Sequence, residues 1–215
     1  MPTPTLIIAN KRYSSWSLRP WLALRVFNVP FTEQMSPFEM ATNSAHFSDF
    51  SPTKKVPVLV DGETTIWESL AILEYVAEMH PQHRWWPADR HARGVARAIA
   101  AEMHAGFLAL RNECPMNMQR TPGSLAISDQ CRIDVTRVET LMSQCFDAHA
   151  GPFLFDTFGI VDAMLAPVVN RVRAYELTQH PAVMRFCDAI EALPAWQQWQ
   201  RESAAEVWVV DAVEL

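Results

Sequence analysis

The first thirty residues alternate between apolar and polar stretches in a way that predicts a strand, a turn and a helix. Residues 6–9, Leu-Ile-Ile-Ala, form a short apolar run that is typical of a buried strand. Apolar residues from 21 to 27 recur at helical spacing, and this pattern ends at Asn28 and Pro30. The polar stretch between them, residues 12–20, carries three serines where the helix should begin.

The pattern of residues 51–69 predicts a β-hairpin followed by a second helix. Pro57 marks a strand start because proline cannot donate to the ladder, and a cis bond before it costs only about 0.5–1 kcal/mol. The pair Asp61-Gly62 predicts the tight turn, with positive φ at both residues. After Trp67 the apolar spacing becomes helical, and this helix should stop before Pro81.

The rest of the chain favours helices after a break. Residues 81–87 contain two prolines and no periodicity, which is typical of a linker. One long helix is predicted from Asp89 to just before Pro115, and another from Ser124. A further helix should begin after Gly159, with Asp162 as a structural residue that meets its free backbone N–H groups.

Polar residues at the two predicted helix starts of the first eighty residues are the candidates for chemistry. Ser14, Ser15 and Ser17 could be helix caps and nothing more, since serine oxygens satisfy free backbone N–H groups. The same hydroxyls are also suitably placed to hold a thiolate. Glu68 and Ser69 stand at the start of the second helix, where a helix N-terminus attracts a carboxylate.

Three motifs, taken in this order, resemble the glutathione transferase superfamily. They are Ser-Ser-Trp-Ser at 14–17, Lys-Val-Pro-Val-Leu at 55–59 and Trp-Glu-Ser-Leu-Ala-Ile at 67–72, and a long helical remainder follows them. The first motif is most similar to zeta-class and related bacterial serine-type members. The resemblance implies glutathione as co-substrate and a homodimer.

The resemblance also implies an α+β fold of two domains. A thioredoxin-like N-terminal domain that binds glutathione is expected over residues 1–80, with a linker over 81–88. An all-α C-terminal domain, expected over 89–215, would contribute to the site of the second substrate.

Site residues follow from the resemblance, position by position. Ser14 matches the serine whose hydroxyl bonds the glutathione sulfur, and Ser15 is its nearest substitute. The main chain of Val56 would pair with the cysteinyl unit, as a peptide extends a sheet edge. Further glutathione contacts are implied for Lys55, Pro57, Glu68 and Ser69. The electrophile is expected against Tyr13, Trp16, Phe107, Arg111 and Asn112.

The serine needs to lower the pKa of the bound thiol only modestly. A free thiol has a pKa of about 8.5, so only a few per cent is the nucleophilic thiolate at neutral pH. One hydrogen bond, with the positive end of a helix nearby, favours the charged sulfur, and a shift of roughly two pKa units would leave most of the bound thiol ionised. The protein then needs no nucleophile of its own.

Composition narrows the class of protein. The net charge of −6 argues against nucleic acid as the main partner, because phosphate contacts need a basic surface. Neither a signal peptide nor a span of roughly 20 uncharged residues is apparent, so we expect a cytoplasmic protein that does not associate with a membrane. Four cysteines without a Cys-x-x-Cys pair, and scattered histidines, favour buried thiols and no metal site: Cys114, Cys131, Cys145 and Cys187.

Three functions stay open at this point. The first is a transferase that conjugates the glutathione thiolate to a small apolar electrophile. The second, suggested by the zeta-class resemblance, is a glutathione-dependent cis-trans isomerase of maleylacetoacetate type, whose dicarboxylic substrate would need cations such as Arg12, Arg111 and Arg173. The third is a non-catalytic binding protein that keeps the fold, which glutathione-agarose retention followed by an activity assay would distinguish.

Overall fold

The computed structural model describes residues 3–38, 45–211 and 214, and its first part is built on a four-stranded sheet. The strand order is β2-β1-β3-β4. β1 runs parallel to β2, while β3 is antiparallel to both of its neighbours. The strands are β1 (Thr5–Ile8), β2 (Thr32–Met35), β3 (Val58–Asp61) and β4 (Thr64–Trp67).

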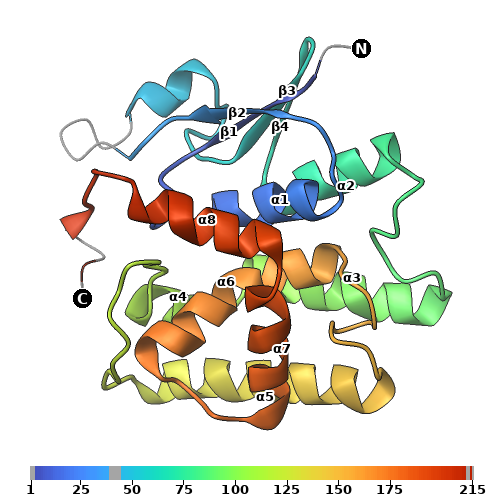
Figure 1. Cartoon of the computed structure of the whole chain (residues 1–215), viewed down its shortest axis with the longest axis vertical. Helices are drawn as coiled ribbons and strands as arrows, with labels where there is room; N and C mark the ends of the chain where they lie inside the picture. Colours follow the sequence, from blue (N-terminus) through green and yellow to red (C-terminus); the bar gives the residue numbers. More distant parts are fainter. Residues whose placement is uncertain (1–2, 39–44, 212–213, 215) are drawn as a thin grey trace.

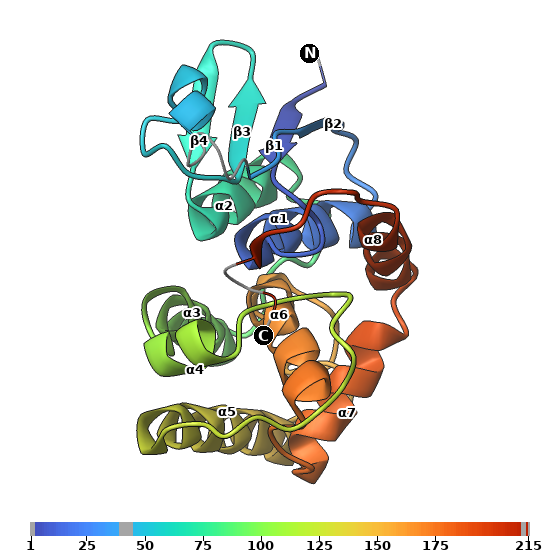
Figure 2. The same cartoon turned by 90° about the vertical axis from the view of Figure 1, so that its left-hand side faces the viewer.

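Two helices cover one face of this sheet, α1 (Ser15–Val26) and α2 (Ser69–Met79). α1 connects the parallel strands β1 and β2, and its side chains Leu18, Leu22 and Leu24 are fully buried. Figure 2 shows α1 and α2 beneath the sheet, between it and most of the helices that follow in the chain. Pro20 is the sixth residue of α1, and because proline has no N–H, the Trp16 carbonyl lacks its usual helical hydrogen-bond donor.

The β3–β4 hairpin corrects one sequence prediction. Asp61 pairs with Thr64, so the central residues of the turn are Gly62 and Glu63 rather than Asp61 and Gly62. Of these, Gly62 has a positive φ of 59°, which a residue without Cβ adopts at little cost. The Val56-Pro57 bond just before β3 is cis.

The second part of the chain is helical in all its regular elements (Figure 1). α6 is central, since Ile160, Met164 and Val169 are fully buried and the helix packs against α1, α3 and α7. α8 lies beside α1. The helices are α3 (Arg90–Ala105), α4 (Leu108–Glu113), α5 (Asp129–Ala148), α6 (Ile160–Tyr175), α7 (Pro181–Glu191) and α8 (Pro194–Ala204).

The single long helix predicted from Asp89 is two helices. Asp89 caps the first as predicted, accepting the Ala92 N–H at 2.7 Å. The helix ends at Gly106, and Phe107 takes a left-handed conformation with φ 60°. The Arg111 side chain donates from Nε to the Gly106 carbonyl at 2.9 Å and from Nη2 to the Met103 carbonyl, which satisfies the freed end of α3.

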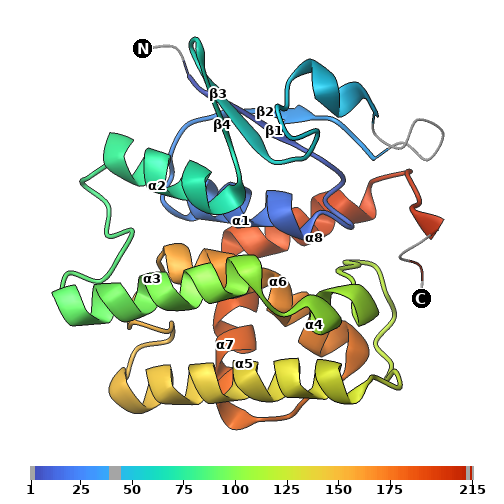
Figure 3. The same ribbon diagram turned by 180° about the vertical axis from the view of Figure 1, so that it is seen from behind.

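The helix predicted from Ser124 begins four residues later. Ser128 is its N-cap, and its hydroxyl oxygen accepts the Cys131 N–H at 3.1 Å. Ser128 in turn donates from N and Oγ to the Glu113 carboxylate at 2.8 and 2.6 Å. This contact with the end of α4 distinguishes Ser128 from Ser124. Figure 3 shows α5 running beside α3 and α4. All four cysteines are buried free thiols, as predicted.

At the start of α6, Asp162 has the structural role predicted for it. Its two carboxylate oxygens accept the N–H groups of Gly159 at 2.9 Å and Leu154 at 3.0 Å, and burial raises its pKa to about 7. A Cβ at Gly159 would lie 2.8 Å from the Trp85 carbonyl oxygen, which explains why a serine cap is absent. The Trp85 oxygen instead accepts the Ile160 N–H at 2.9 Å.

The predicted α+β class is confirmed by this arrangement of a sheet with two helices followed by six helices in the described chain. The domain limits at 80 and 89 stay predictions, and they fall between the end of α2 at Met79 and the start of α3 at Arg90. None of the described helices is both long and apolar enough to cross a membrane.

Candidate functional site

A cavity of about 450 Å³ lies where the β1–α1 turn, the segment before β3 and the start of α2 meet. It brings together residues that are up to 56 positions apart in the sequence. Most of the predicted site residues of the first domain line it. The lining is Tyr13, Ser14, Ser15, Trp16, Phe38, Phe47, Thr53, Lys54, Lys55, Val56, Pro57, Glu68 and Ser69.

The adjacent serines at the start of α1 have different surroundings. Ser14 is the N-cap: its Oγ accepts the Ser17 N–H at 3.3 Å and donates to Ser17 Oγ at 2.7 Å. Ser17 Oγ also accepts the Ala9 N–H at 3.2 Å, which ties the cap to the end of β1. Ser15 is the first residue of α1, and no described residue hydrogen-bonds its hydroxyl. The Ser15 hydroxyl is therefore available to a ligand in the cavity, while the Ser14 hydroxyl serves the helix.

Tyr13 contributes its ring to the cavity, but its hydroxyl is directed elsewhere. The Tyr13 hydroxyl donates to Glu214 Oε1 at 2.5 Å. Burial, together with this bond to a carboxylate, raises the pKa of Tyr13 to about 12. The phenol is thus neutral and engaged, which argues against its use as the donor to a sulfur.

The segment before β3 forms the opposite wall. Ser51 fixes it, because Ser51 Oγ accepts the Lys55 N–H at 3.0 Å and donates to the Lys55 carbonyl at 2.6 Å. Lys54 and Lys55 are exposed, so their ammonium groups are free to meet an anionic ligand at the rim. Phe38 and Phe47 add an aromatic wall, with ring centroids 5.9 Å apart, that the sequence analysis missed because neither lies in a recognisable motif.

The start of α2 presents a carboxylate and a backbone N–H group to the cavity. Glu68 has φ 69° and ψ 123°, a left-handed φ that costs a non-glycine residue on the order of 1–3 kcal/mol and is typical of functional sites. Its Oε2 lies 3.5 Å from His104 Nε2 of α3. Ser69 is fully buried, and its hydroxyl donates to Met164 Sδ at 3.9 Å.

The electrophile residues predicted in the second domain do not join this lining. Phe107 is buried in the core at the break between α3 and α4, and Asn112 is exposed on α4. Arg111 is close to the cavity through Trp16: its guanidinium carbon lies 4.8 Å from the centroid of the Trp16 ring. Of the five residues predicted for the electrophile, Tyr13 and Trp16 alone line the cavity.

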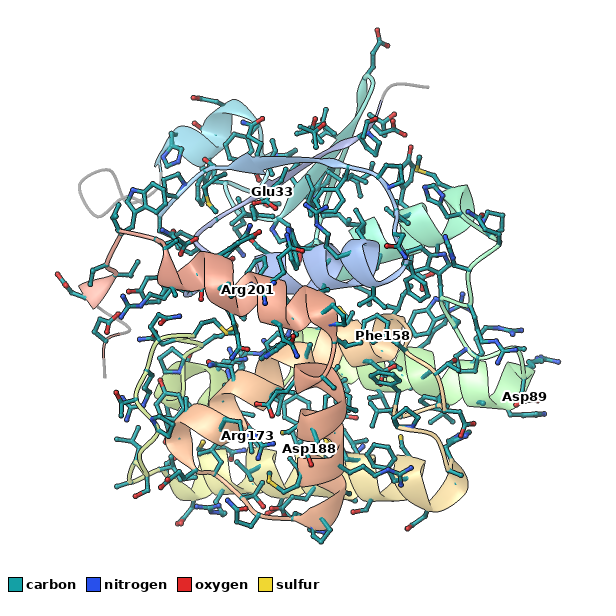
Figure 4. All side chains as sticks on the ribbon, viewed as in Figure 1. Glu33, Asp89, Phe158, Arg173, Asp188 and Arg201 are labelled. Carbon is teal, nitrogen blue, oxygen red and sulfur yellow. The ribbon has the colours of Figure 1, made fainter. Side chains whose placement is uncertain are left out.

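Two of the cations considered for a dicarboxylate are already paired. Arg173, labelled with Asp188 in Figure 4, bridges α6 to α7 through Asp188 at 2.5 Å and Glu191 at 2.9 Å. Arg12 Nη2 lies 2.7 Å from Glu214 Oε1. Neither lines the cavity.

Trp16 is surrounded by basic side chains that the sequence analysis did not assign to the site. The guanidinium carbon of Arg19 lies 4.1 Å from the centroid of its ring, and the His104 ring packs edge-on at 5.3 Å. Burial, with the nearby arginines, lowers the pKa of His104 against the opposing effect of Glu68. The spacing of Arg19 four residues after Ser15 was the signal available in the sequence, since such pairs share a helix face.

No group of three or more His, Cys, Asp or Glu side chains that could hold a metal ion occurs in residues 3–38, 45–211 and 214.

Comparison with known proteins connects this cavity to a family. Residues 13–79 match the family model "Glutathione S-transferase, N-terminal domain", and residues 90–201 match the corresponding C-terminal domain. Among curated proteins, the chain is 26% identical to a zeta-class glutathione S-transferase of Euphorbia esula, covering 90% of this chain and 89% of that protein. It is 26% identical to maleylacetoacetate isomerase of Rattus norvegicus, covering 90% of each chain.

Solved structures share the fold. A glutathione transferase homologue from Burkholderia, solved with bound glutathione, superposes with a TM-score of 0.74 at 22% identity, over 95% of this chain and all of the other. An unclassified glutathione S-transferase from Bombyx mori reaches the same TM-score at 19% identity, over 99% of this chain and 98% of the other.

Proposed function

The chain belongs to the glutathione S-transferase family, and from this premise we propose that it binds glutathione in the cavity and adds the thiolate to a small electrophile. The observation that carries the proposal is the unengaged Ser15 hydroxyl at the N-terminus of α1, in the same cavity as Val56, Glu68 and Ser69. These groups suit the sulfur, the main chain and the γ-glutamyl end of one tripeptide.

We assign the sulfur to Ser15, with Ser14 as its support. The Ser15 hydroxyl would donate to the thiolate, and the free N–H groups at the start of α1 add a positive potential. Ser14 is the alternative preferred on sequence, but a sulfur bound there would compete with the Ser17 contacts that cap the helix. Once the sulfur is ionised, it attacks the electrophile directly and no residue of the protein forms a covalent bond.

The remainder of glutathione fits the charges of the lining. Its γ-glutamyl carboxylate suits the N-terminus of α2 at Ser69, and its ammonium suits the Glu68 carboxylate. Its main chain would pair with that of Val56 at the open end of β3. Lys54 and Lys55, at the rim, suit the glycine carboxylate.

The electrophile would bind beside Trp16 and Tyr13, since these aromatic rings line the cavity next to Ser15. A second candidate reaction is the cis-trans isomerisation named for the Rattus norvegicus relative, in which the thiolate adds, a bond rotates and the thiolate leaves. Both reactions begin with the same thiolate, so they differ in the electrophile and not in the role of Ser15.

A homodimer remains a prediction, which light scattering of the purified protein would test.

The test is a glutathione-binding measurement followed by a turnover screen. Ultraviolet absorbance of the thiolate in the glutathione complex should appear at neutral pH, and a screen of aryl halides, enones, peroxides and maleyl-type acids should show which electrophiles turn over. Conjugation of aryl halides or enones supports the transferase, and turnover of the acids alone supports the isomerase. Glutathione binding without turnover of any class would leave a non-catalytic binding protein, and absence of binding would refute the proposal.

A further inference from the structure

Arg19 is a buried cation that the structure leaves without a counter-charge. Its side chain is fully buried in α1, and its Nη1 and Nη2 have no hydrogen-bond partner among the described residues. Its one hydrogen bond runs from Nε to the Met164 carbonyl of α6 at 2.9 Å. Burying a charge is costly unless it is paired and hydrogen-bonded, so this arrangement requires an explanation.

Two other buried cations of the same chain have more polar partners than Arg19. Lys11, also buried, forms ion pairs with Glu33 at 2.5 Å and with Glu202. Arg171 donates from Nε to the Cys114 carbonyl at 2.9 Å and from Nη1 to the Pro167 carbonyl at 3.3 Å. Lys11 thus has carboxylate partners and Arg171 donates from two nitrogens, whereas Arg19 has neither a carboxylate partner nor a second donating nitrogen among the described residues.

The position of Arg19 relates it to the sulfur site. Arg19 follows Ser15 by four residues in α1, so both side chains lie on one face of the helix, one turn apart. Trp16 connects the two, since it lines the cavity and its ring centroid lies 4.1 Å from the Arg19 guanidinium carbon. Because Arg19 is buried, the dielectric constant between its guanidinium and the cavity is low, and its attraction for a negative charge in the cavity is correspondingly strong.

The charges around this point are mostly positive. Arg111 lies against the same ring and is partly offset by Asp134, which raises its pKa against the lowering effect of burial. Burial and the neighbouring Arg111 and Arg171 lower the pKa of Arg19. The ionisable groups that line the cavity, contact Trp16 or interact electrostatically with Arg19 and Arg111 are Tyr13, Arg19, Lys54, Lys55, Glu68, His104, Arg111, Asp134 and Arg171.

We propose that Arg19 is the fixed counter-charge of the bound glutathione thiolate, acting through the Trp16 ring rather than by contact. The proposal rests on glutathione binding at Ser15. Arg19 then acts on the sulfur without touching it. Ser15 donates the hydrogen bond, and the electrostatic field of the uncompensated Arg19 guanidinium favours the ionised sulfur. The bound thiolate then supplies the negative charge opposite Arg19, which accounts for the absence of a carboxylate partner to Arg19 among the described residues.

The experiment is an ultraviolet titration of the thiolate in the glutathione complexes of four proteins: the parent, Arg19→Met, Arg19→Lys and Arg25→Met. Arg19→Met should raise the apparent thiol pKa by about one unit or more, since an opposite charge nearby favours the ionised form. The acidic limb of the kcat/KM profile should move by the same amount. Arg19→Lys keeps the charge and should recover most of the shift.

Arg25→Met is the matched control. Arg25 lies on the same helix, with its Nη2 3.8 Å from Glu33 Oε2, and its loss should leave the thiol pKa unchanged. A purely structural role of Arg19 would instead change the melting temperature and glutathione affinity of Arg19→Met with no change in the thiol pKa, and that result overturns the proposal. If Arg19→Met does not fold, Arg19→Gln, which can still donate to the Met164 carbonyl, takes its place.

Two further outcomes are distinct. A parent protein that shows no thiolate signal with saturating glutathione refutes the proposed function itself. A parent that ionises glutathione, with Arg19→Met behaving identically, refutes the role of Arg19 alone.

Discussion

At the scale of single residues, the neighbouring serines at the start of α1 divide two tasks between them. Ser15→Ala should lower kcat/KM at neutral pH at least tenfold, because the thiolate loses its donor. Ser14→Ala should mainly reduce stability, by about 1 kcal/mol, since Ser14 caps α1. Kinetics and denaturant unfolding of both variants measure the two effects. Ser128→Ala, which removes the cap of α5 away from the cavity, is the control for capping alone.

Tyr13 offers a second measurement at this scale. Glu214→Gln should lower the pKa of Tyr13 from about 12 towards its ordinary value of 10, because the charged acceptor of its hydroxyl is lost. The shift should be incomplete, because burial is the larger cause and persists. NMR titration of ring-labelled tyrosine, with Tyr13→Phe to assign the signal, measures the change. An unaltered pKa would contradict the contact with Glu214.

Residues of the site were predictable from the sequence where they lie in contiguous motifs at the start of a helix or just before a strand. Ser15, Val56 and Glu68 belong to such motifs, and all three line the cavity. Arg19 shares a helix face with Ser15, but its contact with the Met164 carbonyl and the position of His104 beside Trp16 depend on the packing of α1, α3 and α6, which no local pattern encodes.

At the scale of elements, the buried start of α6 should make stability depend on pH. The pKa of Asp162 is about 7 in the folded protein against an ordinary 3.8, so between roughly pH 4 and pH 7 the folded state holds a proton that the unfolded state has released. This contribution stabilises the fold at low pH and is lost as the pH rises towards 7.

Asp162→Asn tests this dependence. The variant should be less stable than the parent at pH 5, by about 1–3 kcal/mol, because one acceptor for the Gly159 or Leu154 N–H is lost. Its deficit should shrink as the pH rises to 7, by up to about 1.4 kcal/mol per pH unit. Urea unfolding across that range measures it, and a deficit independent of pH would show that Asp162 does not titrate there.

The elements themselves were mostly predictable, because apolar spacing fixes where a helix or strand can bury a face. The exceptions depend on distant side chains. The break at Gly106 is completed by Arg111 reaching back to two carbonyls, and the start of α5 is selected by Glu113, which holds Ser128 rather than Ser124. The apolar periodicity of a single segment predicts neither the Arg111 contacts nor the contact between Glu113 and Ser128.

At the scale of the whole molecule, Lys11 joins the sheet domain to the C-terminal helix. Its ammonium group pairs with Glu33 of β2 and Glu202 of α8 and lies 5.2 and 5.6 Å from the ring centroids of Trp21 and Trp199. Lys11→Met should cost about 3–5 kcal/mol, because it leaves partly buried carboxylates without their cation.

A comparison of ion pairs checks this prediction. Arg137→Met removes an exposed pair with Glu102 and should cost less than about 1 kcal/mol. Glu202→Gln combined with Lys11→Met should be less destabilising than the sum of the single changes, since the two residues share one interaction. Additive effects in unfolding experiments would show that the Lys11 network contributes little to stability.

The dependence of the first eighty residues on the helices that follow has a consequence for engineering. Arg19 relies on a carbonyl of α6, and the Lys11 carbonyl accepts the indole N–H of Trp199 at 2.8 Å. A chimera that grafts this sheet onto a foreign helical half would sever both contacts. We therefore expect such a chimera to fold stably only when the new helical half places a backbone carbonyl where that of Met164 lies and retains Trp199 and Glu202.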